Sequence, residues 1–205
     1  MRAILRSIDV FLERPLSAAS RGIVLLGMAA LVGGGLLPLW RIQLVAPQYQ
    51  EGLTLVMYSH AIVAGHDGQD LAEINTLNHY IGMKPIVQSD FAEMTWMPFA
   101  IGVFGLLALR AAAIGKIRHL VDLGVLFLYF GLFSMATFAY RLWTYGHHLD
   151  SRAPMRIAPF TPILIGRQPI ANFVQTSLPM AGTICMAGFL LSVVAAIWLS
   201  RREAR

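Results

Sequence analysis

Four long apolar runs dominate the sequence, and they limit the fold more than any other feature. A helix rises about 1.5 Å per residue, so about 20 residues cross a hydrocarbon layer of about 30 Å. Because backbone amides must be satisfied internally in that layer, helices are favoured over open strands. The runs therefore predict an all-α membrane protein with four transmembrane helices, at about residues 22–39, 94–109, 120–140 and 178–200.

Composition supports a membrane protein and argues against a soluble enzyme. Hydrophobic residues make up 57% of the 205 residues and charged residues 13%, about half of the usual share of ~25%. The net charge is +5, but the basic residues form no dense run of the kind that binds nucleic acid. We expect one membrane domain over residues 1–205, surrounded by the lipid bilayer and binding no nucleic acid.

The distribution of basic residues predicts an orientation. Ten of the sixteen Lys and Arg residues lie in the N-terminal segment, in the connection at 110–119 and in the C-terminal tail. The other six lie in two long connections, residues 41–95 and 141–175. Because Lys and Arg are enriched on the cytoplasmic side, both termini are predicted to be cytoplasmic and both long loops external. These loops have net charges of −4 and +3, which favours docking against each other, although solvated surface charges are an alternative.

Smaller features add three expectations about the helices. Near the N-terminus, apolar and charged residues alternate at helical spacing as far as Pro15, which predicts an amphipathic helix lying in the cytoplasmic interface. Glycines at 33–35 and at Gly182 are expected to permit close helix packing or a kink. Asp122, near the start of the third run, is expected to pair with Arg118 four residues earlier.

Histidine and methionine gather in the two long loops and suggest copper(I), because imidazole and thioether groups are the donors that this ion prefers. Met57 and His60 are three residues apart, and His79 and Met83 four apart, so each pair would share a face of a helix. Gly82 interrupts any helix before Met83. The alternative is that such residues only pack or cover an interface. The candidate copper ligands are His79, Met83, Met57, His60, His147 and His148.

Enzymatic and haem chemistry have no support in the sequence. GxSxG, P-loop, GxGxxG, HExxH and CxxC patterns are all absent, so no catalytic residue is expected. The apolar runs contain no histidine, so no haem is predicted within the membrane.

Three blocks in the long loops carry a resemblance. They read LVAPQYQEGL at 44–53, DLAEINTLNHYIGMKPI at 70–86 and APFTPILIGRQPIANF at 158–173. Together they resemble a family of small polytopic bacterial membrane proteins associated with nitrous oxide reductase and copper-handling gene clusters. Gln50 departs from the proline of the family pattern. The matching positions are Tyr49, Glu51 and Gly52 in the first block and Asn78, His79, Tyr80, Gly82, Met83 and Lys84 in the second.

The resemblance implies a function and a location. It suggests a non-enzymatic accessory protein of the bacterial inner membrane that serves periplasmic copper handling or nitrous oxide reductase maturation in denitrification, through its outer loops and with a periplasmic protein partner. Two alternatives stay open. One is a quinol-interacting or electron-transfer subunit of a membrane redox complex, with Trp143, Tyr145 and His147 beside a quinone; the other is a purely structural subunit.

Overall fold

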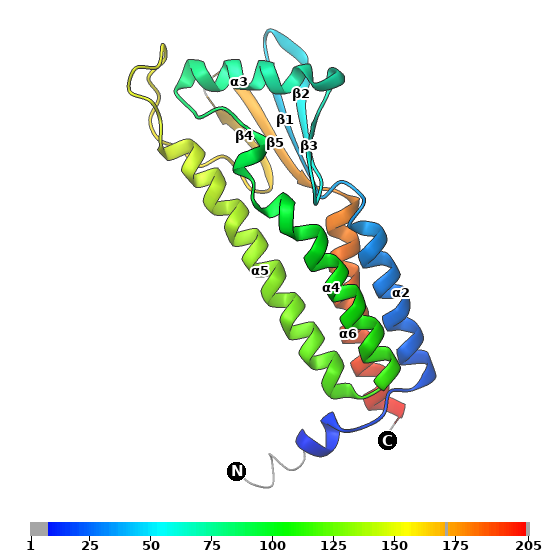
Figure 1. The fold of residues 1–205 in the computed structure, drawn as a ribbon. Helices are drawn as coiled ribbons and strands as arrows, with labels where there is room; N and C mark the ends of the chain where they lie inside the picture. Colours follow the sequence, from blue (N-terminus) through cyan, green and yellow to red (C-terminus); the bar gives the residue numbers. More distant parts are fainter. Residues whose placement is uncertain (1–7, 171, 204–205) are drawn as a thin grey trace.

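The computed structural model describes residues 8–170 and 172–203, and over these residues a bundle of four helices carries a sheet domain at one end (Figure 1). Three helices are long and apolar enough to cross a membrane, judged by length and composition. These are α4 (Glu93–Ile114), α5 (Ile117–His147) and α6 (Ala181–Glu203). The fourth, α2 (Ala18–Gly34), is also apolar but has only 17 residues. The helices indicate a multi-pass membrane protein.

The sheet domain shows that the prediction of an all-α protein is wrong. Five antiparallel strands lie in the order β3-β2-β1-β5-β4 within the described part of the chain. The strands come from both long connections that were expected to be loops. They are β1 (Trp40–Ala46), β2 (Tyr49–Met57), β3 (Ile62–Ala64), β4 (Gly166–Ile170) and β5 (Phe173–Pro179).

The two outer segments meet at the centre of this sheet, where β1 pairs with β5 from Trp40 opposite Pro179 to Val45 opposite Val174. Docking of the two segments on each other is therefore confirmed. Backbone pairing and a shared apolar core join the two segments, and among the described residues only one ion pair does so. That pair connects Glu93 to Arg141 at 2.8 Å.

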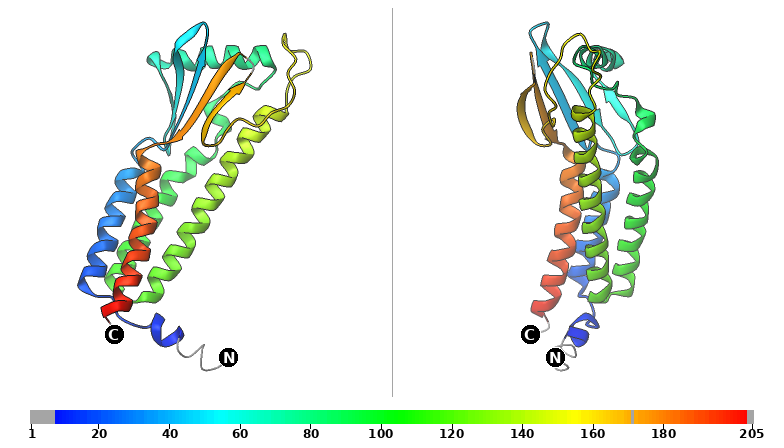
Figure 2. Two further views of the ribbon diagram at one scale, coloured as in Figure 1. Left: turned by 180° about the vertical axis from the view of Figure 1, so that it is seen from behind. Right: turned by 90° about the vertical axis from the view of Figure 1, so that its left-hand side faces the viewer.

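The sheet forms because alternate residues of β1 are apolar. Trp40, Ile42 and Leu44 are buried, and the residues between them are half-buried. One face of the sheet is covered by α3 (Gln69–Ile81), which contributes the buried Ile74 and Ile81 (Figure 2). These side chains form a second apolar core, separate from the core between the membrane helices.

Every predicted helix exists, but its limits differ from those of its apolar run. The helices α4 and α5 extend beyond the runs at 94–109 and 120–140 at both ends, because a helix can continue outside the hydrocarbon layer with charged residues in it. By contrast, α2 ends at Gly34, five residues before the end of its run. The chain then turns through Pro38 directly into β1.

Close packing by small residues is confirmed between α2 and α6. A Cβ atom at Gly34 would lie 2.4 Å from the Cβ of Cys185, and one at Gly182 would lie 2.7 Å from the carbonyl oxygen of Gly34. The space around Gly33 is open, so only part of the glycine run serves this contact. Because β1 follows α2 and β5 precedes α6, the paired strands β1 and β5 are connected along the chain to the two most closely packed helices.

At the opposite end of the bundle, the expected pairing of Asp122 with Arg118 is wrong. Glu13 instead forms ion pairs with both Lys116, at 2.7 Å, and Arg118, at 3.1 Å. The hydrogen bond from Lys116 and then its charge, with a smaller effect of Arg118, lower the pKa of the Glu13 carboxyl. Residues 8–12 are helical, as expected of the amphipathic segment, and residues 1–7 lie outside the described part.

Candidate functional site

The helix α3 ends inside the block at residues 70–86, and this end separates His79 from Met83. Gly82 adopts φ 79°, ψ 12° and terminates the helix, after which the Met83 N–H donates to the Asn78 carbonyl. His79 is exposed, whereas Met83 is half-buried and lines an internal cavity. The two side chains therefore do not share a helix face, so the four-residue spacing does not make them a ligand pair.

The same block docks on the segment that follows α5. The Asp150 N–H donates to the Gly82 carbonyl at 2.8 Å, and the Met155 N–H donates to the Tyr80 carbonyl at 2.9 Å. A Cβ at position 82 would lie 2.8 Å from the Asp150 carbonyl oxygen, so this approach requires glycine. We call the meeting point of residues 78–84 and 147–155 the outer corner.

The paired histidines at the end of α5 are held by the backbone. The Nδ1–H of His147 donates to the Trp143 carbonyl at 2.9 Å, and that of His148 donates to the Thr144 carbonyl at 3.1 Å. His147 also stacks on the Trp143 ring, with centroids 4.6 Å apart. Because a carbonyl can only accept, Nε2 of each ring carries the lone pair. Metal-binding histidines in proteins are commonly oriented in this way.

The one carboxylate at the outer corner, that of Asp150, is paired with Arg152, whose Nε lies 3.5 Å from Oδ1. The Asp150 carboxyl has a lowered pKa, first because the Arg152 backbone N–H donates to it, with smaller effects from the Arg152 charge and from His79. Asp150, His148 and Met155 are exposed here together with His79. The corner thus combines imidazole, thioether and carboxylate groups on one surface.

Met57 and His60 lie elsewhere. Met57 is the last residue of β2, and His60 is exposed in the turn that leads to β3. The Tyr58 N–H donates to the Ala61 carbonyl across this turn, so the chain is not helical here. The three-residue spacing therefore does not put Met57 and His60 on one helix face. Of the six candidate ligands, His79, His147 and His148 lie at the outer corner, and Met57 and His60 lie outside it. Met83 belongs to the corner by sequence, but its side chain lines the internal cavity.

No three residues of the types His, Cys, Asp and Glu form a group that could hold a metal ion, within residues 8–170 and 172–203. A copper ion at the outer corner would therefore be held by few donors, with thioethers or a partner completing the set.

A second histidine site was missed by sequence reasoning. His66 Nδ1 lies 2.7 Å from Asp70 Oδ1, and Asp70 Oδ2 accepts from the Thr54 N–H. Asp70 is almost fully buried, and its hydrogen bond is the main cause of a raised pKa of His66, followed by its charge. His66 and Asp67 both have positive φ, a conformation that non-glycine residues seldom adopt. The four-residue spacing of His66 and Asp70 was the available signal.

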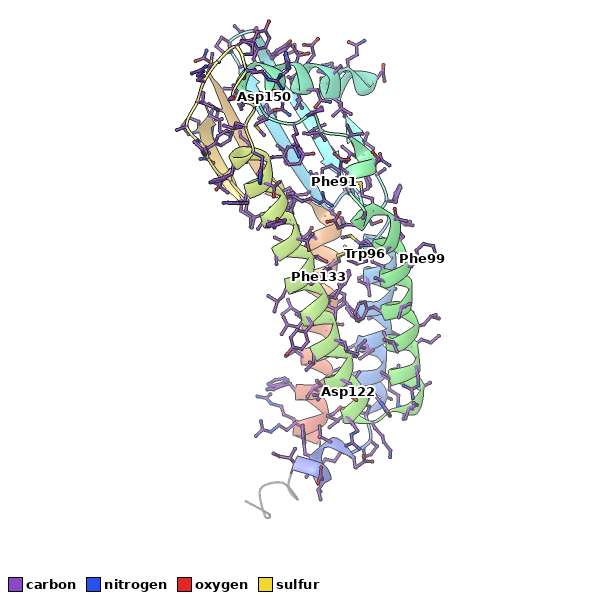
Figure 3. The ribbon with its side chains drawn as sticks, turned by 60° about the vertical axis from the view of Figure 1, so that its left-hand side comes forward. Phe91, Trp96, Phe99, Asp122, Phe133 and Asp150 are labelled. Atoms are coloured by element: carbon purple, nitrogen blue, oxygen red, sulfur yellow. The ribbon has the colours of Figure 1, made fainter. Side chains whose placement is uncertain are left out.

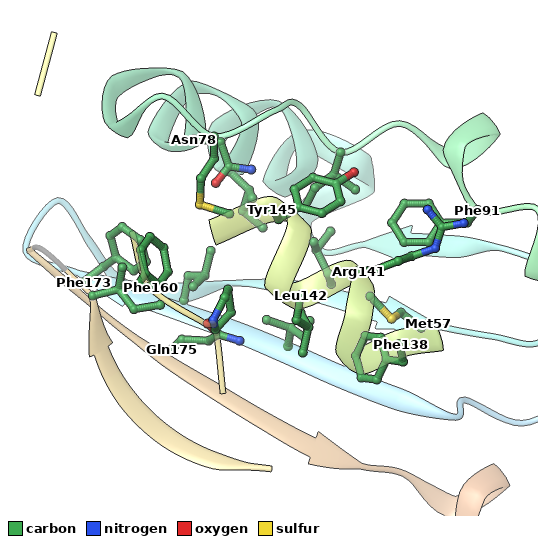
Figure 4. A pocket seen from close by; sticks show the side chains of 18 residues that line it. Met57, Asn78, Phe91, Phe138, Arg141, Leu142, Tyr145, Phe160, Phe173 and Gln175 are labelled. Atoms are coloured by element: carbon green, nitrogen blue, oxygen red, sulfur yellow. The ribbon is translucent and has the colours of Figure 1, made fainter. Parts of the chain in front are cut away.

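Two apolar cavities lie where the sheet domain meets the bundle. The sheet cavity, of about 80 Å³, lies between the sheet, α3 and the end of α5 (Figure 4). The bundle cavity, of about 340 Å³, lies between α4, α5 and α6 next to the sheet. Both are lined by Met57, Phe91 and Phe138, so they adjoin each other. The bundle cavity is within the range of ligand pockets, about 300–1,000 Å³.

Comparisons of the chain with protein-family models, with curated proteins and with solved structures gave no match.

Proposed function

We propose that the protein is a non-enzymatic accessory protein of the bacterial inner membrane that handles copper(I) or assists nitrous oxide reductase maturation in the periplasm. The observation that carries this proposal is the outer corner. The block that resembles the copper-associated family is hydrogen-bonded there to the segment that follows His147 and His148.

The chemistry of the outer corner suits copper(I) as a transient cargo. Imidazole and thioether are soft donors that favour this ion. The Nδ1–H groups of His147 and His148 are occupied by backbone carbonyls, which leaves Nε2 for a metal. Few donors and high exposure favour release to a partner over permanent storage.

The periplasmic location rests on charge. Ten of the sixteen Lys and Arg residues lie in sequence segments outside the sheet domain, as expected for a cytoplasmic face. The sheet domain, its outer corner and a protein partner for it would then lie in the periplasm.

A copper(I) titration of detergent-purified protein against a chelator tests the proposal. The unchanged protein is expected to compete for one ion, and His79→Ala combined with His148→Ala is expected to weaken binding at least tenfold. The matched control is His60→Ala, which removes an exposed imidazole of the same domain away from the corner. Equal copper(I) affinity of the double variant and the control would show that His79 and His148 are not ligands. If the unchanged protein does not compete with the chelator, it does not bind copper(I).

A further inference from the structure

We propose that the two cavities form one binding site for a prenylated quinone, whose ring edge enters the sheet cavity and whose tail lies in the bundle cavity. This inference is independent of the copper proposal, because the exposed histidines of the outer corner line neither cavity.

Two residues that line the bundle cavity are also exposed on the side of α5 that would face lipid. Leu128 and Leu132 of α5 line it and are also exposed, 48% and 59%, on the flank of the bundle. Near this cavity Trp96 of α4 faces Phe133 of α5, with ring centroids 6.0 Å apart (Figure 3). A long apolar chain in the membrane can therefore reach the cavity without crossing water.

The lining of the bundle cavity suits a flexible hydrocarbon chain. Methionine side chains are unbranched and adapt to irregular apolar ligands. Ser134 is a polar exception in this lining, because its hydroxyl is buried and has no hydrogen-bond partner in the described part of the chain. The methionines that line the cavity are Met57, Met94, Met97, Met135 and Met186.

The sheet cavity contains one donor that lacks a partner. Asn78 is 4% exposed, and its Nδ2 makes no hydrogen bond to any residue that the structure describes. Its carboxamide points into the cavity beside the Tyr145 ring (Figure 4). An unpaired buried donor destabilises the empty protein, so a ligand oxygen that accepts from Nδ2 would bind favourably.

The charges around the cavities select a neutral head group. Arg141 Nε and Nη2 donate to the two carboxylate oxygens of Glu93 at 2.9 and 2.8 Å, and the guanidinium lies over the Phe91 ring. Because this cation is already neutralised, a fatty-acid carboxylate or a phosphate would find no free positive partner. A neutral carbonyl on an aromatic-sized ring matches the Asn78 donor and the rings of Phe160 and Phe173.

Of the three residues expected beside a quinone, the cavities contain only Tyr145. Trp143 and His147 stack on each other on the exposed side of α5. The binding surface therefore lies on the inner side of α5.

The test is a titration of the full-length protein, in lipid nanodiscs, with two-isoprene ubiquinone and two-isoprene menaquinone, followed by tryptophan fluorescence. Saturable quenching by at least one quinone is expected. Gly131→Leu should weaken binding more than tenfold, because Gly131 lines the bundle cavity and a Cβ atom there meets no other atom within 4 Å, so that the leucine extends into the cavity. The control is Gly102→Leu, an exposed α4 glycine with equally open surroundings outside the cavities.

A second variant separates binding from folding. Asn78→Leu should weaken quinone binding about five- to tenfold, since one hydrogen bond is lost. The same change should leave the melting temperature of the empty protein equal or higher, since a buried unpaired donor disappears. Absence of saturable quenching, equal binding by Gly131→Leu and Gly102→Leu, or recovery of only phospholipid from the purified protein would overturn the proposal.

Discussion

His66 projects from a strained turn because Asp70 holds it there. The carboxylate of Asp70 is buried, so it can accept from His66 on one oxygen and from the Thr54 backbone on the other without competition from water. This arrangement ties the protonation of an exposed ring to the folding of the sheet domain.

A pH dependence follows from the raised pKa of His66, caused first by its hydrogen bond to Asp70. A raised pKa in the folded state adds stability that is complete below the unfolded value of about 6.5 and is lost as the pH rises through the folded value. We expect His66→Ala to lower the melting temperature more at pH 6 than at pH 9. Thermal unfolding in detergent measures this. In an Asp70→Asn background, His66→Ala should change the melting temperature by the same amount at pH 6 and at pH 9. If His66→Ala lowers the melting temperature of the otherwise unchanged protein equally at both pH values, the prediction is contradicted.

Gly82 and Gly68 permit a matched comparison of two left-handed glycines. Both have positive φ, 79° and 93°, but only Gly82 faces a backbone atom, the Asp150 carbonyl oxygen. Gly68→Ala should cost about 1–2 kcal/mol for the conformation alone. Gly82→Ala should cost more, because residues 150–155 must also move away. Chemical unfolding would measure both, and equal losses would show that the outer corner is not tightly docked.

Among the elements, the helices were predicted and the strands were not, although β1 carries the alternation of apolar residues that identifies a strand. The apolar runs are contiguous, so hydropathy finds the helices regardless of what they contact. In β5 the buried face carries Gln175 and Ser177, so the alternation of apolar residues that identifies a strand is lost. Its partner β1 lies at the other end of the chain, and no local pattern reveals such a pairing. For the same reason sequence spacing could not show that His79 and His148 approach one corner or that α5 borders a cavity.

The pairing of β1 with β5 can be tested by cross-linking. Gln43 lies opposite Thr176, and both are half-buried on the same side of the sheet. Gln43→Cys with Thr176→Cys should form a disulfide on mild oxidation, measured by mobility in a non-reducing gel. Thr54→Cys with Thr176→Cys is the control, because β1 separates these residues by about 10 Å, too far for a disulfide. Equal cross-linking of both pairs would contradict the register.

The whole molecule predicts one orientation in the membrane. If basic residues mark the cytoplasmic face, green fluorescent protein fused after residue 205 should fluoresce, because it folds in the cytoplasm. Alkaline phosphatase fused within residues 150–155 should be active, because it folds in the periplasm. The reverse result for both reporters would place the sheet domain in the cytoplasm and remove the proposed periplasmic function.

Because β1 pairs with strands on both sides, the sheet can be completed only late in synthesis. A ribosome delivers β1, β2 and β3 early, but β5 emerges only after α4 and α5. Until then one edge of β1 is an open template for pairing with other chains. The last strand closes that edge just before α6 is delivered against α2. A ribosome that stalls before Phe173 would therefore release an aggregation-prone product, and completion of the sheet is the checkpoint at which a nascent chain becomes a finished protein.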